Sequence, residues 1–129
     1  THLAVGIAKH IMDQGGTALF TRVIDMIRTV RETYSRDSAR TERQVIAEYA
    51  RPDLMILAEV GHQHGSDAER LTLFDVINAR YEQCRPTLLI TNLSLTGLRE
   101  YLDDRAQDRL REGGGRVVVF DWASQRDKY

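Results

Sequence analysis

Short runs of apolar residues alternate along this chain with longer stretches in which apolar residues recur every three or four positions. The short runs are as long as strands buried on both faces of a sheet. The longer stretches have the period of helices that bury one side. We therefore expect strands at 17–23, 54–58, 87–91 and 116–120, with helices between them.

The predicted helices begin and end at recognisable residues. Gly15-Gly16 ends the first helix, Pro52 follows another, and Ser66 with Glu69 fits a capping box that starts a long one. We expect helices from the N-terminus to Gly15, at about 24–34, at 41–50, from Ser66 through Tyr81, at 96–102 and at 103–112. Helices that alternate with all-apolar strands predict an α/β fold, a three-layer sandwich with a parallel sheet, in one domain over 1–129.

Composition limits the classes of function. With 129 residues, 29% of them charged, and a formal net charge of -1, the chain is not a polybasic nucleic-acid binder, so any charged contact surface must be local. A single cysteine, Cys84, excludes an internal disulfide framework and is compatible with a reducing compartment. No apolar run is as long as a membrane span, and no signal peptide is recognisable. We expect a soluble, cytoplasmic protein that does not enter a membrane.

The apolar run 54–58 ends on the carboxylate of Glu59. Open α/β sheets build their active sites at the carboxyl ends of strands, so a buried strand that delivers an acid there is a candidate site. The alternative is a core strand that stops at a solvated glutamate.

Several segments, in this order, resemble the ATPase domain of helicase loaders of the DnaC type and the related IstB transposition ATPases, within the AAA+ class. The resemblance covers essentially the whole chain. The segments are Thr1-His2-Leu3-Ala4, Leu57-Ala58-Glu59-Val60-Gly61, Leu89-Ile90-Thr91-Asn92-Leu93, Arg105-Ala106-Gln107-Asp108-Arg109-Leu110 and Phe120-Asp121-Trp122. It implies ATP or ADP and Mg²⁺ as ligands.

The resemblance assigns a catalytic role to Glu59, as the Walker B acid that polarises the attacking water. The residue before it should be an aspartate that helps to hold Mg²⁺, and here it is Ala58, which offers no oxygen ligand. Magnesium binding and ATP turnover should therefore be weak.

Asn92 matches the sensor that orients the water or touches the terminal phosphate, although an asparagine also commonly ends a strand. Arg109 matches the arginine finger, which acts on the nucleotide of a neighbouring subunit, and Arg105 lies one turn earlier as a second nucleotide contact. The alternative is a solvated helix face on which Arg105 pairs with Asp108.

Thr1 resembles the last residue of a phosphate-binding loop, with its hydroxyl on the magnesium and the nucleotide. The alternative is an unremarkable terminal residue. The related sheet has five strands in the order 5-1-4-3-2, and its first strand and phosphate loop are not in this sequence. We therefore expect an AAA+ core that is incomplete at its N-terminal end.

Two further features could contact single-stranded DNA by this resemblance. His62, Gln63 and His64 lie in the loop after Glu59, and the two histidines without a third ligand make a weak metal site. Arginines between the first two predicted strands form a locally basic stretch in which acids are interleaved, so a surface helix pair joined by ion pairs is the alternative. These arginines are Arg28, Arg31, Arg36, Arg40 and Arg43.

The leading hypothesis is an ATP-dependent helicase loader in DNA replication. Its partners would be the replicative helicase, single-stranded DNA and further copies of itself, joined through the face that carries Arg109. One alternative is an IstB-type helper of transposition, which acts on duplex DNA. Another, motivated by Ala58, is a binding module that has lost catalytic turnover.

Overall fold

The computed structural model describes residues 1–62, 65–112 and 114–124. Its strands are β1 (Ala18–Arg22), β2 (Leu54–Ala58) and β3 (Thr87–Leu89). Its helices are α1 (His2–Asp13), α2 (Val23–Glu32), α3 (Glu42–Ala50), α4 (Asp67–Glu82), α5 (Leu95–Tyr101) and α6 (Asp104–Arg111).

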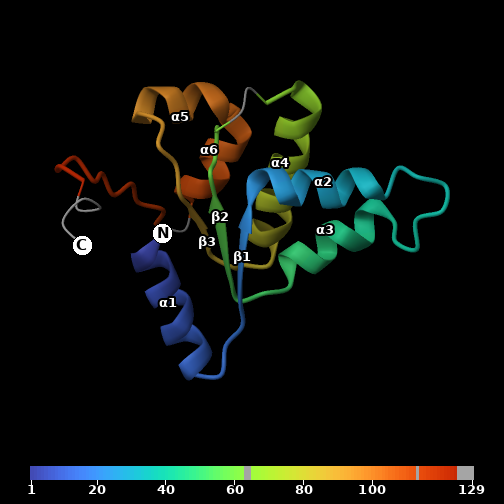
Figure 1. The fold of residues 1–129 in the computed structure, drawn as a ribbon, viewed down its shortest axis with the longest axis horizontal. Helices are drawn as coiled ribbons and strands as arrows, with labels where there is room; N and C mark the ends of the chain where they lie inside the picture. The colour runs from blue at the N-terminus through green and yellow to red at the C-terminus, as the bar shows by residue number, and fades with distance from the viewer. Residues whose placement is uncertain (63–64, 113, 125–129) are drawn as a thin grey trace.

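The three strands form one parallel sheet in the order β1-β2-β3 (Figure 1). Leu54 of β2 pairs with Ala18 of β1, and Met55 pairs with Thr87 of β3. All five residues of β2 are buried because this strand has a neighbour on each side and helices over both faces. The predicted α/β class with a parallel sheet is confirmed.

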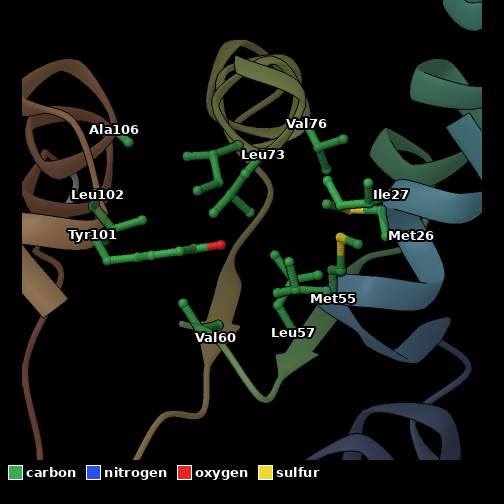
Figure 2. Close-up of a cluster of buried hydrophobic side chains, with 12 residues drawn as sticks. Met26, Ile27, Met55, Leu57, Val60, Leu73, Val76, Tyr101, Leu102 and Ala106 are labelled. Atoms are coloured by element: carbon green, nitrogen blue, oxygen red, sulfur yellow. The ribbon is translucent and has the colours of Figure 1, made fainter. Parts of the chain in front are cut away.

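Alternate side chains of β2 belong to different layers. Leu54 and Ile56 pack against Ala4 and Ala8 of α1, which covers one face of the sheet. Met55 and Leu57 belong to the larger core on the other face, where α2, α4 and the α5–α6 pair meet (Figure 2). Full burial of one such side chain contributes roughly 1.5–3 kcal/mol, so this central strand anchors both layers.

Local signals in the sequence explain where several helices begin. Ser66 accepts a hydrogen bond from the amide of Glu69 (3.2 Å), as its position predicts. The carboxylate of Glu69 does not complete the predicted box, because it pairs with Arg31 of α2 (2.8 Å). A complete capping box forms instead at Thr41 and Gln44, at the start of α3.

The prediction of a strand at 116–120 is wrong. These residues have no strand pairing, and their side chains are exposed, at 63% for Val117 and 72% for Val118. Apolar β-branched residues favour a strand only where a partner strand is available, and the described sheet ends at β3. The segment therefore runs extended along the side of the molecule away from α2 and α3 (Figure 1).

No helix in the described ranges is long and apolar enough to cross a membrane.

Candidate functional site at the carboxyl edge of the sheet

Glu59 leaves the end of β2 in an unusual backbone conformation. Its φ is 56°, in the left-handed region that is costly for a residue with a side chain. Hydrogen bonds on both sides hold it there, because Ile90 donates to the Leu57 carbonyl (2.8 Å) and Val60 donates to the Ile90 carbonyl (3.1 Å). Strained backbone of this kind persists where surrounding contacts fix it, and it concentrates at functional sites.

Thr91 also stabilises the turn that follows β2 at Glu59. Its hydroxyl donates to the Val60 carbonyl (2.7 Å) and accepts from the amide of Leu93 (3.0 Å). A side chain at Gly61 would be strained, because its φ is 75° and a Cβ would lie 2.2 Å from Leu93 Cδ1. The ends of β2 and β3 therefore form one rigid unit beneath Glu59.

Arg22 lies beside Glu59, and the sequence interpretation did not single it out. It is the last residue of β1 and pairs in register with Ala58, which brings its terminal nitrogen Nη1 to 3.9 Å from Glu59 Oε2. It also binds both oxygens of Asp25 on α2, at 2.7 and 3.1 Å. This hydrogen bond lowers the pKa of Asp25, so the arginine sits between two carboxylates. The only available sequence signal was a basic residue at a strand end.

A small pocket opens next to Glu59. Its volume is about 20 Å³, which is room for about one water molecule. The ring of Tyr101 closes one side, and burial raises the pKa of its hydroxyl. The lining comes from α2, from the residues that follow β2, from α4 and from the end of α5: Val23, Ile24, Ile27, Glu59, Gly61, His62, Glu69 and Tyr101.

The other residues predicted for this edge are placed as follows. Asn92 follows β3 and is exposed, one residue beyond Thr91. Thr1 is the first residue before α1, and α1 runs opposite to the strands, so its start points toward their carboxyl ends (Figure 1). Thr1 makes no side-chain capping hydrogen bond to α1, and the first amides of a helix can bind an anion.

Arg105 and Arg109 do not join this edge. Arg109 packs on α4, where its Nε donates to Asn78 (3.0 Å) and its guanidinium covers the ring of Tyr81. Arg105 covers the ring of Phe74 and pairs with Asp103 (3.3 Å), rather than with Asp108. Within this chain, Arg109 is thus placed apart from Glu59, in the layer formed by α4 and α6.

The basic stretch is partly neutralised. Arg28 pairs with Asp25 (3.8 Å), Arg31 with Glu69 (2.8 Å), and Arg40 with Glu48. Arg36 and Arg43 are exposed and have no ion pair to a described residue. His62 lines the pocket, whereas His64 and Gln63 lie outside the described residues.

The described residues at this edge do not provide a complete set of protein ligands for a metal ion. The described residues contain no group of three or more His, Cys, Asp or Glu side chains that could hold a metal. Ala58, directly before Glu59, is buried at 5% exposed and offers no oxygen ligand. Any Mg²⁺ here would depend on phosphate oxygens, with Thr1 and water-mediated contact to Glu59 as the protein's share.

The amino-acid sequence of this chain is similar to those of a known family and of several helicase loaders. The family described as IstB-like ATP binding protein matches residues 1–109. The replicative helicase loader DnaC of Escherichia coli (strain K12) is 29% identical over 127 residues, which are 98% of this chain and 51% of that protein. The loader DnaC of Buchnera aphidicola subsp. Baizongia pistaciae (strain Bp) is 28% identical over the same length. The chain therefore spans about half the length of these relatives.

Solved structures show the same fold. DnaA from Aquifex aeolicus bound to AMPPCP superposes with a TM-score of 0.68 at 18% identity, over 86% of this chain and 33% of that one. A replication initiator DnaA bound to AMPPCP and single-stranded DNA gives 0.67 at 19% identity, over 84% and 32%. At these identities the likeness shows the fold alone.

Proposed function

Since this chain belongs to the family of IstB-like ATP-binding proteins, we propose that it binds ATP at the carboxyl edge of its sheet and acts as a helicase loader in DNA replication. The observation that carries the proposal is the placement of Glu59. It is held at the end of a fully buried strand, beside Arg22, with a pocket the size of one water molecule next to it.

Glu59 would accept a hydrogen bond from the attacking water, which makes the water oxygen a better nucleophile. Arg22, whose Nη1 lies 3.9 Å from Glu59 Oε2, would help to orient this carboxylate. Asn92, at the end of the neighbouring strand, would orient the water or the terminal phosphate. The amides and the hydroxyl at the start of α1 would meet the other phosphates. Bound Mg²⁺ would supply neutralisation of phosphate charge.

The test measures ATP binding and hydrolysis on the full-length protein. Glu59→Gln removes the acceptor charge and keeps the shape, so turnover should fall by about 100-fold or more while affinity for a fluorescent ATP analogue changes little. The matched control is Glu100→Gln, an exposed acid on α5. Equal turnover in the two variants, or no binding of the analogue by the unmodified protein, would sink the proposal.

Ala58 favours a second candidate, a binding module without catalytic turnover. Under the leading proposal, Ala58→Asp supplies a carboxylate at the buried strand end and should raise magnesium-dependent turnover by about tenfold. Ala58→Asn has a similar size without the charge and is the control. If the unmodified protein binds ATP and neither variant gains turnover, the binding module is favoured.

The proposed partners are the replicative helicase, single-stranded DNA and further copies of this chain. Arg36 and Arg43 support a DNA contact because no described carboxylate pairs with them. Their double replacement by glutamine should weaken binding of labelled single-stranded DNA and reduce its salt dependence, whereas Arg40→Gln, which removes a paired arginine, serves as the control. Preference for duplex over single-stranded DNA would instead support a transposition helper.

A further inference from the structure

Two arginines of α6, Arg105 and Arg109, pack against a row of side chains on one face of α4. Phe74, Asn78 and Tyr81 follow one another at helical spacing on α4, and Arg105 and Arg109 are one turn apart on α6. The guanidinium carbon of Arg105 lies 4.3 Å from the Phe74 ring centroid, and that of Arg109 lies 4.6 Å from the Tyr81 ring centroid. Each arginine is therefore supported on an aromatic face.

The contacts of Arg109 determine which of its atoms stay available. Its Nε donates to Asn78 Oδ1 (3.0 Å), and one face of its guanidinium covers Tyr81. The amide nitrogen of Asn78 donates in turn to Glu82 (3.1 Å), which fixes the amide with its oxygen toward the arginine. Asn78 thus accepts the hydrogen bond of Nε, and the two terminal nitrogens of the guanidinium remain available to bind a ligand.

One carboxylate lies close to these two nitrogens. Glu112 is 3.9 Å from Arg109 Nη1, which is beyond hydrogen-bond distance, and it accepts a hydrogen bond from the Tyr81 hydroxyl. The Arg109 side chain is 36% exposed. The two terminal nitrogens form a planar pair of donors on a partly exposed side chain, and such a pair matches the geometry of a phosphate group.

We propose that Asn78 and Tyr81 are positioning residues, which hold Arg109 with its terminal nitrogens directed outward toward a phosphate of the nucleotide bound by a second copy of this chain. The inference rests on the proposed function for the identity of that phosphate. The orientation of the guanidinium rests only on the contacts within this chain. A guanidinium fixed before association loses less conformational entropy when the phosphate arrives.

The first arm of the test reads turnover in the full-length protein. Asn78→Leu removes the acceptor for Nε, and Tyr81→Leu removes the ring, so each should lower kcat by about tenfold. Since Arg109 would act on the neighbour's nucleotide, the ATP concentration at half-maximal rate should change much less. Asn78→Asp keeps the acceptor and Tyr81→Phe keeps the ring, and both should restore most of the rate. Gln83→Ala, on the exposed end of α4, is the control.

The second arm does not depend on activity. The Nε–H proton of Arg109 should exchange with solvent slowly in the unmodified protein, measured by NMR of ¹⁵N-arginine, and about tenfold faster in Asn78→Leu. Unchanged exchange in Asn78→Leu would overturn the positioning role, whatever the turnover. Slow exchange with no turnover in the unmodified protein would support positioning and refute the proposed function. Normal kcat in both leucine variants of an active protein would overturn the inference and leave that function standing.

Discussion

At the scale of single residues, the polar side chains at the two ends of the strands have different roles. At the carboxyl edge, Arg22 and Glu59 face each other 3.9 Å apart and remain partly exposed. At the amino edge, Asp53 is tied to Thr17, accepting from its amide (2.8 Å) and its hydroxyl (3.2 Å). The first arrangement leaves a carboxylate available for chemistry, whereas the second uses its carboxylate to join the starts of β1 and β2.

The Asp53 contact predicts a dependence of stability on pH. The hydrogen bond from the Thr17 amide lowers the pKa of Asp53 below 3.8, so the folded state binds a proton less readily than the unfolded state. The contribution is full above pH 3.8 and is lost as the pH falls through the lowered pKa. Asp53→Asn should flatten the fall in the free energy of unfolding as the pH is lowered below 3.8, measured by urea titration.

The control for this experiment is Asp13→Asn, whose carboxylate contacts exposed Lys9. An identical slope of unfolding free energy against pH in the Asp53 variant and the unmodified protein would contradict the prediction.

At the scale of elements, one buried arginine joins four segments. Arg80 of α4 is 0% exposed and donates to the carbonyls of Tyr49, Asp53 and Pro86 and to the hydroxyl of Thr87. Burial lowers its pKa to about 10, so it stays charged at neutral pH. It therefore fixes α4 and the end of α3 against the starts of β2 and β3.

Arg80→Met should destabilise the fold strongly. Methionine retains much of the volume but removes the donor of three part-buried hydrogen bonds to carbonyls and of one to the Thr87 hydroxyl, and each lost partner costs about 1–3 kcal/mol. We expect a loss of roughly 3 kcal/mol or more in the free energy of unfolding, measured by chemical denaturation. Arg85→Met is the matched control, since Arg85 is only partly buried and donates to one carbonyl, that of Ala50. Equal losses in the two variants would show that the network contributes little.

At the scale of the whole molecule, exposed apolar residues gather on one side. The open edge of β3, the extended segment 116–120 and the outward side of α1 are all incompletely covered within the described structure. Phe120 and Trp122 contact each other edge to face, with ring centroids 5.0 Å apart, and both remain exposed.

This surface predicts self-association of the 129-residue chain when it is produced alone. Val118→Lys places a charge at the most exposed of the valines there and should shift sedimentation toward the monomer. Leu71→Lys is the control, because Leu71 is an exposed apolar residue on α4, away from this segment. If Val118→Lys and Leu71→Lys change the sedimentation equally, the chain does not associate through 116–120.

The sequence by itself determined the elements whose cause is local. Apolar runs bounded by proline and glycine predicted β2 correctly, and polar caps such as Ser66 predicted where α4 begins. The order of strands and helices, with the family resemblance, was enough to predict the parallel α/β fold and the strand end that carries Glu59. These features depend on neighbours in the chain, so periodicity and capping reveal them.

The tertiary structure decided which residues meet across elements. The approach of Arg22 to Glu59, the stacking of Arg109 on Tyr81 and the four acceptors around Arg80 depend on how distant segments pack. The segment 116–120 shows that local composition alone does not decide whether a strand forms. Its composition favours a strand, but the described sheet offers it no partner. A strand is completed by hydrogen bonds to another segment, and these are set by packing rather than by its own residues.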